Sequence, residues 1–325
     1  MLELLALAWQ LSFPAKPAKK PEPKAEIVSF DKVWDRAPHN AFTDLTRFRE
    51  RFYLAFREGS GHDSDDGVIR VLSCQRTERW EDNGRITYPA ADLRDPKLTV
   101  TPDNRLMLTA AARMHSSSDV RWKTAAWFST DGRAWEDLTI IGEPEVWMWR
   151  VSWHQGRAYG MGYSTAEPRF LRSYIGAANG KQFTVLNPSI LSGDYVNESS
   201  TVYLPDETAV CLLRRDPKSA LLGTSRPPYR GWTWDDLGVR IGGPHLIQVP
   251  DGRLVAAVRL YEPEKRTSLC WVNLEEKSIK EFLALPSGGD TSYAGLVYHE
   301  GLLHVSYYSS HEGRAAIYFA KVKLP

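Results

Sequence analysis

Arginine side chains recur at equivalent positions in several similar segments, and their type and spacing give the first indication of chemistry. Each segment reads as two short strands joined by a tight turn, with an arginine opening the first strand or closing the second. These residues are Arg57, Arg94, Arg150, Arg214 and Arg259. A guanidinium group binds a carboxylate through two parallel hydrogen bonds, so a cluster of arginines predicts a site for an anionic ligand.

Other polar residues occupy the same ends of these segments. His39, Glu198 and Tyr293 open first strands, whereas Tyr307-Tyr308 and His311 close the last second strand. In an antiparallel pair the start of the first strand lies beside the end of the second. We therefore expect these side chains to share one site with the arginines.

The elements that must position this site are six two-strand segments, spaced about 40 to 55 residues apart. Turn signals such as Asp251-Gly252 and Glu300-Gly301 lie between their apolar runs. The segments are 39–59, 94–111, 149–164, 197–216, 242–261 and 292–313. This period is typical of four-stranded propeller blades, so the sequence predicts an all-β, six-bladed β-propeller.

The two ends of the chain have different roles in this prediction. Residues 25–34 are strand-like and would complete the last blade, closing the ring without a free sheet edge. We expect residues 25–325 to form a single propeller domain. Residues 1–24 combine a signal-like apolar run with a Pro/Lys-rich linker, which we expect to be poorly ordered.

A second repeated motif lies between the hairpins. Residues 129–135 read Ser-Thr-Asp-Gly-Arg-Ala-Trp, a polar turn closed by an aromatic residue, and residues 177–183 have the same length and order. In such a turn the aspartate caps backbone amides, the glycine takes a left-handed conformation and the aromatic ring packs into the blade. Residues 73–80 and 225–234 look like degenerate copies. This motif resembles the Asp-box of the sialidase (neuraminidase) superfamily, where it is a peripheral folding element.

The resemblance extends over roughly residues 25–325 and implies roles for particular residues. In sialidases a tyrosine is the nucleophile, a glutamate activates it, an aspartate on a first-blade loop is the acid/base, and three arginines bind the substrate carboxylate. By position, Tyr293 matches the nucleophile, Glu198 the activating glutamate, and Asp63 or Asp65 the acid/base, with Asp66 nearby. A phenol is a weak nucleophile at neutral pH, so an adjacent carboxylate must accept its proton.

The sequence departs from the sialidase pattern in the first blade. Sialidases usually open this blade with Arg-Ile-Pro, whereas residues 39–42 here are His-Asn-Ala-Phe. Arg214 and Arg259 match two members of the arginine triad by position, and Arg57 or Arg94 would have to replace the third. The resemblance implies a hydrolase that cleaves a terminal acidic sugar. Another carbohydrate-active enzyme and a non-catalytic propeller that binds glycan or protein are the alternatives.

Composition excludes several other classes. A formal net charge of +1 gives no indication of a nucleic-acid partner. No histidine or cysteine spacing matches a metal site, and no nucleotide-binding motif occurs, so we expect neither a catalytic metal nor a cofactor. The apolar run of residues 1–13 is too short to span a membrane. A secreted or periplasmic location is slightly favoured, and a cytoplasmic one stays open.

Overall fold

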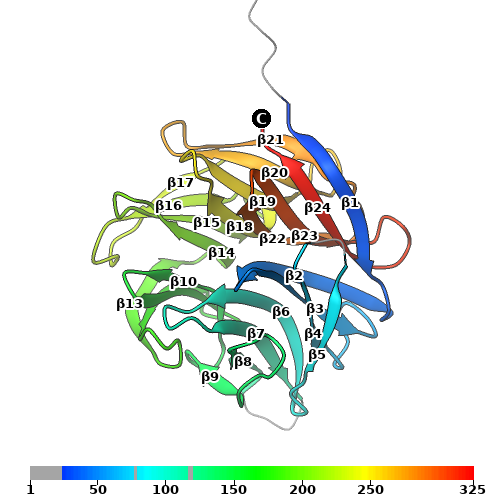
Figure 1. Ribbon diagram of the computed structural model, residues 1–325. Helices are drawn as coiled ribbons and strands as arrows, with labels where there is room; N and C mark the ends of the chain where they lie inside the picture. Colours follow the sequence, from blue (N-terminus) through cyan, green and yellow to red (C-terminus); the bar gives the residue numbers. More distant parts are fainter. Residues whose placement is uncertain (1–23, 77–78, 116–119) are drawn as a thin grey trace, which may run out of the picture.

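In the computed structural model, residues 24–76, 79–115 and 120–325 are described, and they form six four-stranded antiparallel sheets around a common axis (Figure 1). The first three sheets are β2 (His39–Phe48), β3 (Arg51–Gly59), β4 (Val68–Cys74) and β5 (Glu81–Ile86); β6 (Ala91–Val100), β7 (Leu106–Met114), β8 (Trp122–Ser129) and β9 (Thr139–Ile141); and β10 (Val146–His154), β11 (Arg157–Ser164), β12 (Phe170–Gly176) and β13 (Phe183–Ser192). The next two are β14 (Tyr195–Tyr203), β15 (Ala209–Asp216), β16 (Leu221–Ser225) and β17 (Thr233–Asp236); and β18 (Ile241–Gln248), β19 (Leu254–Leu260), β20 (Arg266–Asn273) and β21 (Ser278–Ala284). The predicted six-bladed β-propeller is confirmed.

The last blade contains strands from both ends of the described chain. It consists of β22 (Thr291–His299), β23 (Leu302–Ser309), β24 (Ala316–Lys323) and β1 (Glu26–Trp34), in the order β1-β24-β23-β22. In the β1–β24 pair, Phe30 lies opposite Ala320, and its ring stacks on Tyr318 with a centroid distance of 5.3 Å. The pairing expected for residues 25–34 is therefore present. The expectation for residues 1–23 lies outside the described residues.

The turns of the inner hairpins follow from their residue types. Between β22 and β23, Glu300 and Gly301 have φ angles of 49° and 79°. Two left-handed residues in succession form the type of turn that matches the twist of a two-stranded ribbon. Between β18 and β19 the Gly252 amide donates to the Val249 carbonyl over 2.9 Å. Both turns lie where the sequence predicts them.

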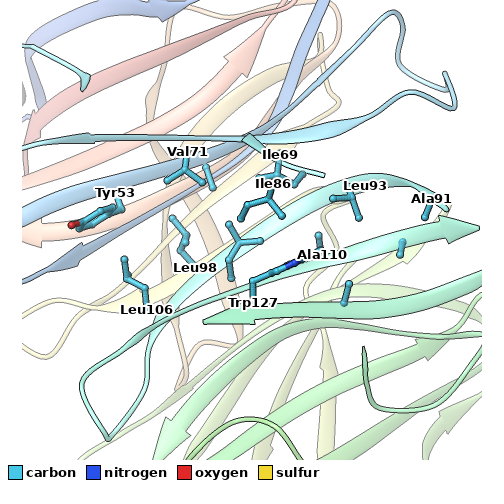
Figure 2. Close-up of a cluster of buried hydrophobic side chains, with 14 of the residues drawn as sticks. Tyr53, Ile69, Val71, Ile86, Ala91, Leu93, Leu98, Leu106, Ala110 and Trp127 are labelled. Atoms are coloured by element: carbon cyan, nitrogen blue, oxygen red, sulfur yellow. The ribbon is translucent and has the colours of Figure 1, made fainter. Parts of the chain in front are cut away.

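Apolar side chains fill the space between neighbouring blades. Figure 2 shows this for the first two blades, where Ile69 and Val71 of β4 face Leu93 and Leu98 of β6. Ile69 and Leu93 are fully buried. The hydrophobic core is thus distributed around the ring, and each blade buries its faces against its neighbours. Within the described residues, no helix is long and apolar enough to cross a membrane.

The Asp-box-like turns form as predicted. After β8, one side-chain oxygen of Asp131 accepts the backbone amides of Arg133 at 2.8 Å and Ala134 at 2.9 Å. Gly132 has φ 70°, and Trp135 packs against the core cluster of the first two blades. In the second copy, the Asn179 side chain caps the Lys181 amide at 3.0 Å. These turns hold outer strands and lie away from the axis.

Ring closure by β1 gives a stability prediction. Deleting residues 1–34 should lower the melting temperature by more than about 5 °C, because it removes the partner of β24 and leaves that edge unpaired. Deleting residues 1–20 keeps β1 and is the matched control, for which we expect almost no change. Differential scanning fluorimetry on both truncations measures the effect. Equal melting temperatures would contradict the structural role of β1.

Candidate functional site

The inner strand of every described blade carries a β-bulge at about the same depth along the axis. In β2, for example, Ala41 pairs with Arg57 and Asp44 pairs with Ala55, so two residues oppose one. Strands β6, β14, β18 and β22 show the same two-against-one pattern. In β10 the bulge is the single residue Trp149, which has no counterpart in β11. The bulged residues are Phe42-Thr43, Asp95-Pro96, Trp149, Asn197-Glu198, Gly243-Pro244 and Tyr293-Ala294. A bulge bends its strand and redirects a side chain, and such features are frequent next to active sites.

Several bulged residues have a left-handed backbone, which costs a residue other than glycine about 1–2 kcal/mol. The φ angle is 58° at Phe42, 48° at Asp95 and 50° at Tyr293. Their side chains meet those of other blades: the Tyr293 ring lies 5.3 Å from the Phe42 ring and 5.9 Å from the Trp149 ring. The bulges therefore gather side chains from separate blades at the axis.

Tyr293 and Glu198 form the hydrogen bond that the sequence analysis requires. The Tyr293 hydroxyl donates to Glu198 Oε1 over 2.6 Å, although the two residues belong to different blades. Arg214 Nη1 donates to the same Glu198 oxygen at 2.6 Å and to the Tyr293 hydroxyl at 3.0 Å. The backbone amide of Gly243 donates to Glu198 Oε2 at 2.7 Å. We call Tyr293, Glu198 and Arg214 the axial site.

The electrostatics of the axial site keep the phenol protonated. Burial and the neighbouring Glu198 carboxylate raise the pKa of Tyr293 well above its ordinary value, against the opposing effect of Arg214. Glu198 is itself buried, and both of its oxygens accept hydrogen bonds. Tyr293 therefore acts as a nucleophile only if Glu198 removes its proton.

Arg259 and its partners lie beside the axial site. The guanidinium carbon of Arg259 lies 5.3 Å from the centre of the Tyr293 ring, and Arg259 Nη2 donates to the Tyr308 hydroxyl at 3.0 Å. Tyr308 donates to Asp290 Oδ1 at 2.7 Å. The other carboxylate oxygen of Asp290 contacts His39, which lies in this group as predicted. These hydrogen bonds and the surrounding positive charges hold the pKa of Asp290 far below its ordinary value, although burial alone would raise it.

Tyr307 does not belong to this group, contrary to the expectation from the sequence. Its hydroxyl donates to the Pro286 carbonyl at 2.8 Å, and its ring stacks with Phe30 of β1. Successive residues of a strand face opposite sides of the sheet, so Tyr308 points to the site and Tyr307 into the blade. His311 is also elsewhere: its ring lies 4.9 Å from Tyr318, and its Nδ1 contacts Ser309.

Arg57 supports the site without lining it. The side chain is fully buried, and its Nε and Nη2 donate to Asp92 Oδ1 over 3.1 and 2.8 Å. Its Nη1 and Nη2 also donate to the carbonyls of Gly61 and Ser64, so Arg57 anchors the loop after β3. Because the guanidinium is fully buried, it cannot contact a substrate carboxylate. The expectation that Arg57 binds substrate is wrong for this structural reason.

Arg150 lies on the axis but beyond the bulges. It donates to both oxygens of Asp44 over 3.0 Å each, and it lines a hollow of about 510 Å³ together with His245 and Leu98. Burial alone would raise the pKa of Asp44, yet Arg150 and His245 hold it below its ordinary value. Arg150 therefore compensates a buried carboxylate and does not meet Tyr293.

The loop carboxylates stand at the rim. Asp63 is highly exposed and accepts a hydrogen bond from Arg94 Nη1 at 3.2 Å, whereas Asp65 pairs with Arg113 at 2.6 Å. Asp66 accepts the backbone amide of Ser60. With Arg113, Asp63 and Asp65 line an open hollow of about 880 Å³. Arg94 holds the pKa of Asp63 below its ordinary value, although slight burial opposes this effect.

Asp95 and Lys97 are two further functional candidates, which the sequence pattern does not single out. Asp95 is 5% exposed, and its buried Oδ1 has no hydrogen-bond partner among the described residues. Burial raises the pKa of Asp95 to about 6 and lowers that of Lys97 to about 8. The Lys97 ammonium lies 4.5 Å from the centre of the Trp149 ring. The Asp95-Pro96 pair within an apolar strand was the available signal, because proline inside a strand often marks a bulge.

The chain matches no family model and no curated protein. Among solved structures, a protein of unknown function from Dyadobacter fermentans has a TM-score of 0.82 at 18% identity, over 93% of this chain and 100% of that one. An α-L-arabinanase of Penicillium chrysogenum complexed with arabinobiose has a TM-score of 0.71 at 12% identity, over 92% and 99%.

A sialidase of Trypanosoma rangeli in complex with sialic acid has a TM-score of 0.66 at 10% identity. The match covers 93% of this chain and 59% of the sialidase. The protein is thus a six-bladed β-propeller with distant structural similarity to glycoside hydrolases, both sialidases and arabinanases. At these identities the similarity establishes the fold alone.

The close packing at the bulges gives a second prediction. A Cβ atom added to Gly243 would lie 3.0 Å from Tyr293 Cγ, and Gly243 has φ 54°. Gly156 has φ 72° but open space around it, so Gly156→Ala is the matched control. We expect Gly156→Ala to lower the free energy of unfolding by about 1 kcal/mol, and Gly243→Ala to lower it by about 1 kcal/mol more. Urea denaturation measures both, and equal losses would contradict the tight contact with Tyr293.

Proposed function

We propose that the protein is a glycoside hydrolase in which Tyr293 is the nucleophile and Glu198 its general base. The observation that carries this proposal is the 2.6 Å hydrogen bond from the Tyr293 hydroxyl to Glu198 Oε1, between residues of different blades. Two independent bulges aim these side chains at each other. The structural similarity to sialidases and arabinanases supports the reaction class.

The expected reaction has two steps. Glu198 removes the phenolic proton as the Tyr293 oxygen attacks the anomeric carbon, and the glycosidic bond breaks. Arg214, which contacts both groups, stabilises the negative charge that develops on the phenolic oxygen. Water then cleaves the glycosyl–tyrosine bond, so the configuration at the anomeric carbon is retained. The Gly243 amide holds Glu198 in position throughout.

Asp95 is the better candidate for the proton donor to the leaving group. A general acid must be protonated at the working pH. Burial raises the pKa of Asp95 to about 6, whereas the pairing of Asp63 with Arg94 keeps the Asp63 carboxylate ionised. Asp95 also occupies a bulge and carries a buried oxygen that has no partner in the described part of the chain.

The charge pairing favours a sugar without a carboxylate. Arg214 lies 2.6 Å from Glu198 and 2.7 Å from Asp216, and Arg259 lies 3.4 Å from Asp290. Residues 39–42, which stand where sialidases carry Arg-Ile-Pro, contain no arginine. Because the protein's own carboxylates already face these arginines, a neutral terminal glycoside is the first candidate substrate. A terminal acidic sugar is the second, favoured by the convergence of Arg214 and Arg259 on Tyr293.

A panel of aryl glycosides tests this function. Turnover of a neutral glycoside, including the arabinofuranoside, supports the first candidate, and turnover of the sialyl compound supports the second. Analysis of the product by nuclear magnetic resonance reports whether the configuration is retained. If no glycoside is hydrolysed, the protein is instead a propeller that binds glycan or protein without catalysis.

The roles of the axial pair are tested by substitution. Tyr293→Phe should nearly abolish turnover, since only the reacting oxygen is lost and the ring contacts remain. Glu198→Gln should lower kcat by about 10²–10⁴-fold, because an amide cannot accept the phenolic proton. The double variant should be little worse than either single one, since the two groups act as a unit. Tyr307→Phe is the matched control, and steady-state kinetics that show equal effects for Tyr307→Phe and Tyr293→Phe would refute the assignment.

The proton donor gives a pH prediction. Because the pKa of Asp95 is about 6 and its protonated form is the active one, kcat/KM should fall as the pH rises through about 6. Asp95→Asn should remove this limb and slow substrates with poor leaving groups by about 10²–10⁴-fold, while nitrophenyl glycosides lose little. Asp63→Asn is the control. If Asp63→Asn shows this pattern and Asp95→Asn does not, the donor is Asp63.

A further inference from the structure

Two histidines and an aspartate converge at the rim of the axial site. His39 opens β2, His62 lies in the loop after β3, and Asp290 precedes β22. His39 Nε2 lies 3.3 Å from Asp290 Oδ2, and His62 Nδ1 lies 2.7 Å from the same oxygen. All three of these atoms lie within 4.8 Å of one another. In the described part of the chain, this is the one such group of three potential metal ligands.

We propose that His39, His62 and Asp290 bind a divalent transition-metal ion of the zinc class. Zinc is bound by imidazole nitrogen and carboxylate oxygen at about 2.0–2.2 Å, which places neighbouring ligand atoms about 3.3 Å apart in a tetrahedron. The His39–Asp290 distance already has this value, and the shorter His62–Asp290 distance needs a shift of well under 1 Å. Two imidazoles with one carboxylate also select a late first-row metal over calcium or magnesium.

Neighbouring groups orient the aspartate for this role. Asp290 Oδ1 accepts a hydrogen bond from the Tyr308 hydroxyl at 2.7 Å and lies 3.4 Å from Arg259 Nη2. These two donors occupy one oxygen and direct the other, Oδ2, to the two imidazoles. Hydrogen bonds of this kind to a ligating carboxylate tune metal sites and fix ligand geometry.

The two imidazole rings are also held in place. The Phe42 ring packs against both of them, with centroid distances of 6.0 Å to His39 and 5.2 Å to His62. Arg94 Nη2 donates to the backbone carbonyl of His62 and so fixes the loop. His39 is buried, whereas the side chain of His62 is 46% exposed. The cluster therefore combines rigid ligands with an opening to solvent through which an ion can enter.

The positive charge of Arg259 limits the affinity of the cluster for a metal ion. Arg259 contacts Asp290, and its charge opposes that of a divalent ion at short range. Because the side chain of His62 is 46% exposed, water can complete the coordination of the ion, which is the arrangement of an open metal site. We therefore expect one ion per chain with a dissociation constant of about 1–10 μM, weaker than structural zinc sites reach.

The experiment is metal binding to the full chain without a histidine tag. Zn²⁺ is titrated calorimetrically, and Co²⁺ is followed by the visible absorption of its d–d bands, which reports imidazole coordination. His62→Ala should weaken binding of both ions by at least about tenfold, because it removes one of three ligands. Its side chain is half exposed, so this variant should fold, and an unchanged far-ultraviolet circular dichroism spectrum verifies that. Asp290→Asn should have the same effect on binding.

His115→Ala is the matched control, since His115 is an exposed histidine at the same rim whose Nε2 contacts the Asp65 carbonyl outside the cluster. It should bind both ions as the parent does. No binding by the parent at 100 μM Zn²⁺ or Co²⁺ overturns the proposal, as does equal binding by His62→Ala and the parent. An equal loss in His115→Ala also overturns it. None of these readouts depends on glycoside hydrolysis, so this proposal and the proposed function can fail separately.

Discussion

The structure depends on one backbone constraint, the β-bulge that interrupts the inner strand of each described blade. An uninterrupted pleated strand would point every second side chain into the neighbouring blade. The extra residue breaks this alternation and turns Tyr293, Asp95 and Phe42 to the axis. Their left-handed backbone is unfavourable, and it persists because the surrounding sheet determines it from both sides. Six similar blades thus bring polar and aromatic side chains of different blades together at the axis.

Buried charges around this cluster are compensated in pairs. Arg57 with Asp92 and Arg150 with Asp44 are almost completely removed from water, and each arginine makes several hydrogen bonds. Such pairs add little net stability compared with apolar residues, but removal of one partner costs about 3–5 kcal/mol. They also fix position: Arg57 binds the loop that carries His62 and Asp63. The buried Arg57–Asp92 pair therefore helps to set the geometry at the rim.

Much of the fold follows from the sequence, whereas the site follows only in part. Turn signals such as Glu300-Gly301 are local, so they reveal hairpins and their number, and the strand at residues 25–34 completed the count. Side-chain direction depends on register, which a bulge changes by one residue. Arg150 directly follows the β10 bulge, at the position that Asp44 and His245 occupy in their own inner strands, and it accordingly lies with them beyond the axial site. Tyr307 and Tyr308 are adjacent in β23 and face opposite sides of the sheet, so only Tyr308 reaches the site.

The side chains that surround an arginine determine its role, even where two arginines occupy the same position in their blades. Arg57 and Arg259 stand at equivalent positions, opposite Ala41 and Gly242 of their inner strands. The Arg57 guanidinium is fully buried and forms an ion pair with the Asp92 side chain of the next blade. Arg259 meets the Thr291 carbonyl and the Tyr308 hydroxyl, and so stays at the edge of the site. The sequence shows both arginines but not the neighbours that distinguish them.

The pairing of β1 with β24 has a consequence for the order of events during synthesis. The two strands lie far apart in the sequence, so their pairing closes a very long loop of chain. We expect this pairing to form late in folding, because closing a long loop costs conformational entropy. Tyr293 lies in this last blade, whereas Glu198 lies in the fourth. Until strands β22 to β24 have emerged from the ribosome, the first five blades can assemble, but Tyr293 and Glu198 cannot yet be held together. Any activity of the axial site therefore begins only after translation has passed β24.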